Sequence, residues 1–273
     1  MRNFGDRLAE AVERKRSQLV VGLDPVFEPD AAAVREFCYG IVDAVAPHAV
    51  AVKPQSAFFE THGADGRRAF EEVCEYARAA GLLVIADAKR GDIGSTAQAY
   101  ARAFIPLADA VTVNPYLGGD SIEPFLDACR REGAGIFCVV KTSNAGGADV
   151  QDVTLSDGTR LWQHVAGLVA TWGEDLVGSG GLSAVGAVVG ATFPRAVAEA
   201  RRLMPKAVLL LPGVGEQGGD PAELAPAFAS GAAGALVSAS RSVIYASRGA
   251  DWRAAAGAEA ERLAREVWAV SGW

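Results

Sequence analysis

The sequence predicts an α/β fold, a single-domain (β/α)8 barrel of the TIM type that spans residues 1–273. Eight short apolar runs rich in β-branched residues alternate with helix-forming stretches, and eight strand–helix units in about 250 residues are typical of such a barrel. Half of the residues are hydrophobic, which is enough for a large core. The expected strands are residues 19–24, 49–53, 82–89, 110–115, 135–142, 184–191, 207–212 and 234–239.

The stretches between these runs include two clear helical patterns and one long loop. Residues 65–80 and 194–204 have amphipathic spacing, and Pro194 suits a first helical turn. Residues 144–161 are longer than an ordinary barrel loop and contain Ser156–Thr159, a hairpin signal. We therefore expect a small excursion near the mouth of the barrel.

Charge and cysteine content exclude several classes of partner. The formal charge of −7 argues against a general nucleic-acid or membrane-surface binder. The four cysteines show no metal-type spacing, and neither do the three histidines, so we expect no metal site. The chain has neither a signal-peptide core nor an apolar run of about 18 residues, and widely spaced thiols fit a reducing compartment. We expect a cytoplasmic protein.

A cluster of three charges follows the third apolar run. Side chains two apart on a strand point the same way, so Asp87 and Lys89 should lie together, with Asp92 just beyond the strand. Buried charges without partners cost several kcal/mol. The cluster is therefore either a catalytic site or an ion-pair strut, in which case Asp92 would cap a helix starting near Ser95.

Polar side chains stand at the end of nearly every predicted strand. The carboxyl ends of barrel strands meet on one face, where barrel enzymes have their active sites. Because a stable barrel needs apolar residues rather than these, their convergence indicates a site. In chain order they are Asp24, Lys53, Gln55, Asp87, Lys89, Asn114, Thr142, Ser143, Thr192, Gln217, Ser240 and Arg241.

The last two strand ends have the character of a phosphate site. A glycine-rich segment, Pro212–Gly219, follows the seventh run, and Ser238–Arg241 ends the eighth. Glycines let backbone N–H groups approach an oxyanion, and an arginine supplies a charged fork. The pattern is neither a P-loop nor a dinucleotide-binding fingerprint. The candidate ligands of a phosphate ester are Gly213, Gln217, Ser240 and Arg241.

With these motifs the chain resembles the orotidine 5′-phosphate decarboxylase family. The resemblance rests on Asp87–Asp92 together with Lys53 at the end of the second strand, and it extends from Gly22 to Arg241. The segments Lys53–Glu60 and Val140–Asn144 resemble the longer, type 2 branch of that family.

The resemblance implies a cofactor-free enzyme that converts orotidine 5′-phosphate to UMP, and an active unit that is a homodimer. Lys53, Asp87, Lys89 and Asp92 match the alternating charged network of the family. Asp92 would enter the site of the neighbouring subunit together with Ile93 and Thr96. Further substrate contacts implied by the resemblance are Asp24 and Gln55 near the ribose, Thr142 and Ser143 at the ring, Gln217 and Arg241 at the phosphate, and Asn114 as a secondary candidate.

The residues also indicate a mechanism. Loss of CO₂ from C6 of a pyrimidine leaves electron density with no neighbouring carbonyl to accept it. A fixed ammonium at that carbon, supplied by Lys89, would stabilise the carbanion and then donate the proton. Flanking carboxylates favour the protonated form, which argues against Lys89 as a Schiff-base nucleophile.

Two alternatives remain open at this point. A sugar-phosphate decarboxylase or aldolase of the same superfamily would use Mg²⁺, and an acidic ligand would be expected at the end of the second strand, where this chain has Lys53. A non-catalytic phosphate-binding barrel would be expected to keep the glycine-rich loop and to lose the charged network.

Overall fold

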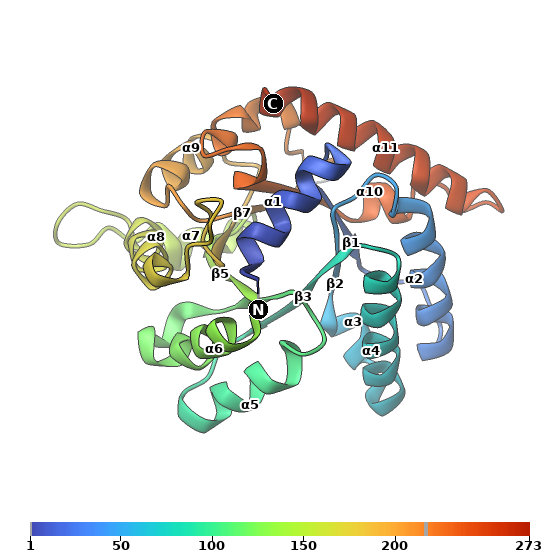
Figure 1. Cartoon of the computed structure of the whole chain (residues 1–273), viewed down its shortest axis with the longest axis horizontal. Helices are drawn as coiled ribbons and strands as arrows, with labels where there is room; N and C mark the ends of the chain where they lie inside the picture. Colours follow the sequence, from blue (N-terminus) through green and yellow to red (C-terminus); the bar gives the residue numbers. More distant parts are fainter. Residues whose placement is uncertain (1, 216–217) are drawn as a thin grey trace.

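A computed structural model describes residues 2–215 and 218–273, and its centre is a closed barrel of eight parallel strands (Figure 1). The strands pair in sequence order, and the last strand returns to pair with the first. This confirms the predicted barrel. The strands are β1 (Leu19–Leu23), β2 (Ala51–Pro54), β3 (Leu83–Arg90), β4 (Ala110–Val113), β5 (Gly135–Lys141), β6 (Val185–Val189), β7 (Leu209–Pro212) and β8 (Ala235–Ala239).

Each strand lies within two residues of its predicted bounds at either end. The apolar runs were informative because parallel strands covered by helices are buried on both faces; β1, β2, β4, β6 and β8 are buried along their whole length.

Helices surround the barrel and one closes its amino-terminal end. The outer helices include the two that the sequence predicted, and Pro194 begins the later of them. Among the described residues, no helix combines the length and the apolar character needed to span a membrane. The larger helices are α1 (Phe4–Lys15), α2 (Ala31–Val45), α4 (Gly63–Ala79), α5 (Gly94–Phe104), α6 (Gly119–Glu132), α8 (Leu161–Trp172), α9 (Pro194–Leu203) and α11 (Trp252–Ser271).

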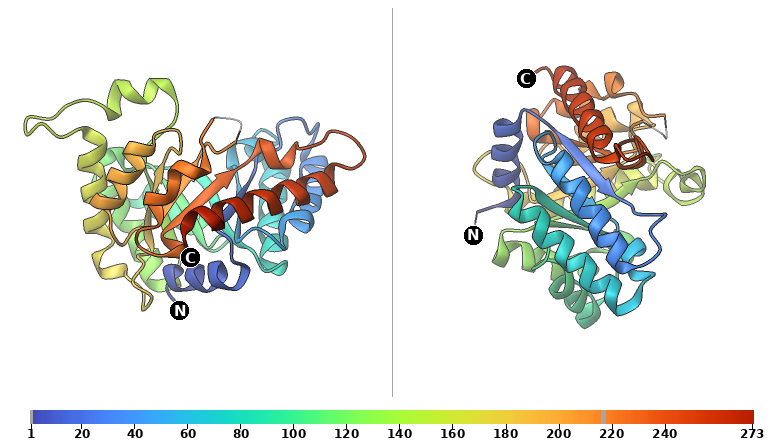
Figure 2. Two further views of the ribbon diagram at one scale, coloured as in Figure 1. Left: turned by 90° about the horizontal axis from the view of Figure 1, so that it is seen from above. Right: turned by 90° about the vertical axis from the view of Figure 1, so that its right-hand side faces the viewer.

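Helix α1 lies across the amino-terminal end of the barrel, on the side opposite the excursion at residues 144–161 (Figure 2). Its first residue, Phe4, is buried and packs edge-on against Phe137 of β5, with ring centroids 5.9 Å apart. A Cβ at Gly135 would lie 2.5 Å from the Phe4 ring, so this plug needs a glycine beneath it. With α1 covering this end, the cavity described below opens on the carboxyl-terminal side.

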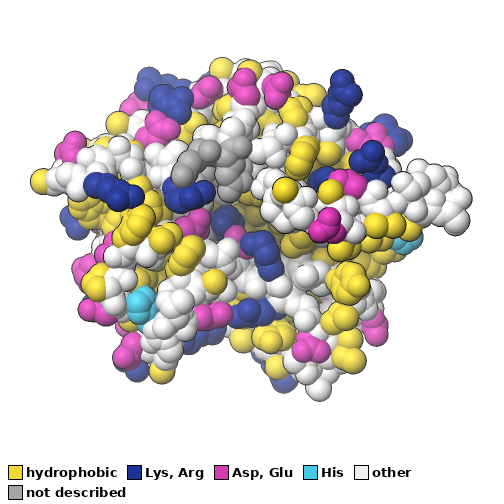
Figure 3. All heavy atoms as spheres, turned by 180° about the vertical axis from the view of Figure 1, so that it is seen from behind, with side chains coloured by type: hydrophobic (Ala, Val, Ile, Leu, Met, Phe, Trp, Pro, Cys, Tyr) yellow, Lys and Arg dark blue, Asp and Glu magenta, His cyan; other side chains and the backbone are white. Residues whose placement is uncertain are grey.

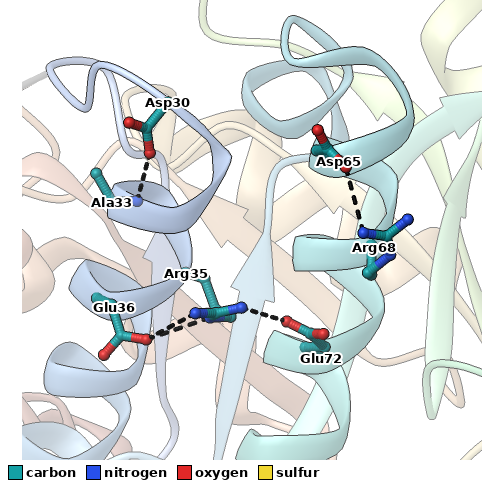
Figure 4. A network of polar contacts seen from close by, with 7 residues as sticks. All are labelled: Asp30, Ala33, Arg35, Glu36, Asp65, Arg68 and Glu72. Carbon is teal, nitrogen blue, oxygen red and sulfur yellow. Dashed lines mark hydrogen bonds and ion pairs between the residues drawn. The ribbon is translucent and has the colours of Figure 1, made fainter.

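Helices α2 and α4 are neighbours on the outside of the barrel (Figure 4). Arg35 of α2 donates to Glu72 of α4 and to Glu36 on its own helix, each at 3.1 Å. Exposed pairs of this kind contribute little to stability. The stacked rings of Tyr39 and Tyr76, 4.0 Å apart, and the buried apolar faces hold the two helices together.

The connection between β7 and β8 departs from strict strand–helix alternation. It contains two 3-10 helices, η4 (Pro221–Phe228) and η5 (Ala232–Gly234), in place of an α-helix. Pro226 lies inside η4, where it lacks the N–H that an α-helix would use. The helical segment between these two strands is therefore a 3-10 helix rather than an α-helix.

A buried arginine donates hydrogen bonds to this irregular connection. Arg201, on the last turn of α9, is 5% exposed, and burial lowers the pKa of its guanidinium to about 10. It donates to the carbonyls of Ala227 and Gly234 in the connection and to those of Met204 and Pro205 beside α9. One side chain therefore ties the irregular connection to the barrel.

The excursion at residues 144–161 consists of η2 (Ala145–Gly147), α7 (Ala148–Gln151) and a tight turn closed by an antiparallel bridge between Thr154 and Arg160. A buried lysine at the end of β5, Lys141, donates to Asp152 of this segment at 2.7 Å. The excursion is thus attached to the mouth of the barrel by an ion pair.

We predict that Arg201→Met lowers the free energy of unfolding by about 2–4 kcal/mol, because it removes the guanidinium hydrogen bonds to four carbonyl groups. The matched control is Arg202→Met, which removes an exposed pair with Glu199 and should change stability by about 0.5 kcal/mol or less. Urea unfolding of both variants measures the difference. Equal effects would show that the Arg201 hydrogen bonds contribute no more than a surface pair.

Candidate active site

A cavity of about 520 Å³ opens at the carboxyl ends of the strands. Figure 3 shows this face of the molecule, where cationic and acidic side chains lie together in the central hollow. The lining combines strand ends from both halves of the barrel. From the predicted set it contains Asp24, Lys53, Gln55, Asp87, Lys89, Gly213, Ser240 and Arg241.

Asp87 is the centre of the charged network on one side of this cavity. Its Oδ2 accepts from Lys53 Nζ at 2.6 Å, and its Oδ1 accepts from Lys89 Nζ at 2.5 Å and from the Thr112 hydroxyl at 2.9 Å. Lys53 and Asp87 are buried, whereas the side chain of Lys89 is 43% exposed toward the opening. The network therefore leaves one ammonium accessible to a ligand.

The pairing also fixes the charge of the buried members. Burial alone would raise the pKa of Asp87, but the charges of Lys53 and Lys89 outweigh it and hold that pKa well below its usual range. Burial alone would lower the pKa of Lys53, but the charges of Asp87 and Asp24 outweigh it and leave that pKa raised. Both side chains are ionised at neutral pH.

Lys89 reaches Asp87 through an irregular backbone rather than through regular strand alternation. Its φ is +46°, in the left-handed region, and the register between β3 and β4 shifts between Ala86 and Arg90. The Lys89 N–H donates to the hydroxyl of Thr112 at 2.9 Å, which holds this conformation. A left-handed non-glycine residue costs about 1–2 kcal/mol, and such strain is typical of functional sites.

Asp24 stands on the neighbouring wall, at the end of β1. Within the described residues its Oδ1 is buried without a hydrogen-bond partner, and so is the hydroxyl oxygen of Ser242. Both residues line the cavity. A buried acceptor without a protein partner is costly, so a ligand bearing hydroxyl groups would stabilise this wall.

The glycine-rich segment after β7 forms the wall across the barrel from the charged network of β2 and β3. Gly213, Gly215 and Gly218 have φ values of 102°, 86° and 85°, which other residues rarely adopt, and the Gly219 N–H donates to the Gly213 carbonyl at 3.0 Å. Arg241 begins the short helix α10 (Arg241–Ile244) directly after β8 and lines the same cavity. Gln217, predicted to bind phosphate, lies outside the described residues.

Three predicted residues lie beyond the cavity at the start of α5. Asp92 Oδ1 accepts from the Ile93 N–H, and α5 begins at Gly94 with Ile93 as its N-cap and no side-chain cap. The alternative in which Asp92 caps this helix is therefore wrong. Ile93 is 57% exposed and Thr96 is exposed as well, so neither contributes to the cavity of its own barrel.

Three further candidates are likewise absent from the cavity lining. Asn114 accepts from the Tyr116 N–H and so orders its own loop. Thr142 is bonded to Asn144 and to Gln151 of the excursion. The backbone of Ser143 lies against Gly190, where an added Cβ would be 3.1 Å from it.

Sequence reasoning missed several residues that shape the site. Thr112 is a polar residue inside an otherwise apolar strand, and that interruption was a usable signal. Ala57 and Phe58 line the cavity from α3 (Ser56–Glu60), a short helix without a clear pattern. Across the described residues, no three His, Cys, Asp or Glu side chains lie close enough together to hold a metal ion.

A family model described as orotidine 5′-phosphate decarboxylase / HUMPS family matches residues 17–256. The chain belongs to this family. Its member from Deinococcus radiodurans, named orotidine 5′-phosphate decarboxylase, is 46% identical over 258 residues, covering 92% of each chain. The enzyme of the same name from Roseiflexus castenholzii is 46% identical over 274 residues, covering 96% of each.

A solved structure supports the same family assignment. The orotidine 5′-phosphate decarboxylase of Leishmania donovani superposes with a TM-score of 0.82 at 37% identity, and the alignment covers 98% of both chains. Sequence and fold therefore both place the chain in this family, as the motifs predicted.

We predict that the stability conferred by Asp87 depends on pH in one direction. Because the folded-state pKa of Asp87 is depressed, its contribution is complete above the unfolded-state pKa of about 3.9 and is lost as the pH falls toward the folded value. The free energy of unfolding of wild type minus that of Asp87→Asn should therefore decrease from about pH 5 downward. Urea titrations at several pH values measure it. A difference that stays constant down to about pH 3 would contradict the pairing.

Proposed function

We propose that this chain decarboxylates orotidine 5′-phosphate to UMP without a cofactor. The observation that carries the proposal is the ion-paired network of Lys53, Asp87 and Lys89, which shares one cavity with a glycine-rich loop and Arg241. The network supplies an accessible ammonium, and the loop supplies a wall suited to phosphate. Family membership and relatives of that name support the same reaction.

Lys89 carries the chemical step. When CO₂ leaves C6, the electron pair of the broken bond remains on that carbon, and the Lys89 ammonium stabilises it and then transfers a proton to it. Asp87 accepts from this ammonium and from Lys53, so the reacting group is positioned before substrate binds. Preorganised charge in a dry site is worth far more than the same charge in water.

The rest of the nucleotide extends along the cavity walls. The unpartnered Oδ1 of Asp24 suits a ribose hydroxyl, with Gln55 beside it. Contacts at the phosphate end bind a part of the substrate that is remote from the reacting carbon. Their binding energy is therefore available for orienting the ring. We assign the phosphate to Gly213, Gln217, Ser240 and Arg241, the ring to Thr142 and Ser143, and a secondary role to Asn114.

The Mg²⁺-dependent alternative fits the residues less well. Its metal would need an acidic group at the end of β2, and the buried group there is Lys53, whose ammonium repels a cation. A non-catalytic barrel would not need a strained, accessible lysine paired to a buried carboxylate. We place the reaction in the cytoplasm, because all four cysteines are free, buried thiols.

We predict that the purified protein removes the orotate chromophore of orotidine 5′-phosphate in EDTA as fast as without it. Lys89→Ala should lower turnover by about 10⁴-fold, because it removes both the stabilising charge and the proton donor. Lys206→Ala, an exposed lysine at the other end of the barrel, is the matched control and should retain full activity. Turnover abolished by EDTA and restored by Mg²⁺ would favour the metal-dependent alternative. A Lys89→Ala variant with a tenth of wild-type activity would make Lys89 a structural residue.

We further propose that the active unit is a homodimer with shared sites. Asp92 lies just outside its own cavity, and exposed apolar side chains surround the carboxyl ends of β3 and β4: Ile93 is 57% exposed, Tyr116 79% and Leu117 48%. Gly91 brings the two segments together, since a Cβ there would lie 2.8 Å from the Asn114 carbonyl. Exposed apolar patches of this kind are typical of protein interfaces. A second copy would cover them and bring Asp92, Ile93 and Thr96 to the partner's site.

A mixing experiment tests this arrangement. Inactive Asp92→Ala and inactive Lys89→Ala subunits, combined under conditions of subunit exchange, should recover activity. Each mixed dimer would contain one site with Lys89 from one chain and Asp92 from the other, both intact, while the opposite site carries both lesions. Full exchange, checked by native mass spectrometry, without recovered activity would place Asp92 in the site of its own chain.

A further inference from the structure

Tyr245 connects the two walls of the cavity through its hydroxyl group. The Val26 N–H, just after β1, donates to the Tyr245 oxygen at 2.9 Å, and the Tyr245 hydroxyl donates to the carbonyl of Asp24 at 3.4 Å. The Tyr245 hydroxyl therefore accepts one hydrogen bond and donates another, both with the backbone segment that carries the Asp24 carboxylate.

The same phenol is held in a fixed position relative to Arg241. Tyr245 follows α10 directly, and its N–H donates to the Arg241 carbonyl at 3.1 Å. Its ring stacks on Phe37 of α2 at 5.5 Å, and Phe37 stacks on Trp252 of α11 at 5.1 Å. Phe27 meets the ring edge-on at 5.1 Å. Helices α2, α10 and α11 lie together in Figure 1. The stacked rings thus pack the Tyr245 side chain against α2 and, through Phe37, against α11.

The two walls also meet on the inner side of the cavity. A Cβ at Gly22 would lie 1.9 Å from the Ser240 oxygen and 3.5 Å from Asp24 Oδ1, so only glycine lets the end of β8 approach β1 this closely. The segments that carry Asp24 and Arg241 are thus in contact at Gly22 and again at Tyr245.

We propose that Tyr245 is a positioning residue that fixes Asp24 relative to Arg241, so that phosphate and ribose are held in one geometry. Within the described residues, Asp24 Oδ1 has no hydrogen-bond partner, and the backbone that carries this carboxylate is bonded to Tyr245. The inference rests on the proposed function, because it takes a ribose phosphate as the ligand that spans the two walls.

The test is a double-mutant cycle between Tyr245→Phe and Asp24→Ala. Tyr245→Phe keeps the stacked ring and leaves the Val26 N–H without its acceptor. It should lower kcat/KM for orotidine 5′-phosphate, and weaken UMP binding by calorimetry, by about tenfold. In the Asp24→Ala background the same substitution should change either quantity by no more than about twofold, because residues that act through one another are not additive.

The matched control is Tyr76→Phe, which removes a hydroxyl bonded to Asp43 on the outer helices and keeps its ring stacked on Tyr39. It should leave both quantities unchanged in either background. Wild-type behaviour of Tyr245→Phe, or an equal loss in the two backgrounds, would overturn the positioning role. A wild-type protein that neither turns over the substrate nor binds UMP would overturn the proposed function, and this inference with it.

Discussion

The carboxylate of Asp87 accepts from Lys53 on one oxygen and from Lys89 and Thr112 on the other. Two ammonium groups on one buried carboxylate balance the cost of removing each charge from water, and removing the carboxylate would leave Lys53 buried without that partner. The position of Lys89 depends on the same contact, since its left-handed backbone is held by Thr112 and its side chain by Asp87. The charged network at the carboxyl ends of the strands therefore depends on Asp87 of β3.

The barrel makes this arrangement possible by its rigidity. The eight strands fix the ends from which the charged residues and the proposed ribose and phosphate ligands project, while α1 closes the opposite end. The strain at Lys89 is tolerated because β3 is paired on both sides. Contacts far from C6 then contribute by orientation: the Tyr245 hydroxyl fixes the wall that carries Asp24 against the wall that begins with Arg241.

The barrel and half of the site could be predicted because both depend on local pattern. The apolar runs predicted the eight strands, and the charged residues at the ends of these runs included Lys53, Asp87 and Lys89, which line the cavity. Features that depend on tertiary closure could not be read this way. The left-handed turn at Lys89 is held by a hydroxyl from the next strand, and the hydrogen bonds of Arg201 join segments that are far apart in the sequence.

The central claim is that Lys89 stabilises a carbanion at C6 and exchanges a proton with it. By microscopic reversibility the same group should remove the C6 hydrogen of UMP, so the protein in D₂O should replace that hydrogen with deuterium without any CO₂ present. Loss of the C6–H signal of UMP in the proton NMR spectrum measures this directly. The account predicts exchange with wild type and none above the rate of free UMP with Lys89→Ala. Exchange at the wild-type rate in Lys89→Ala would contradict it.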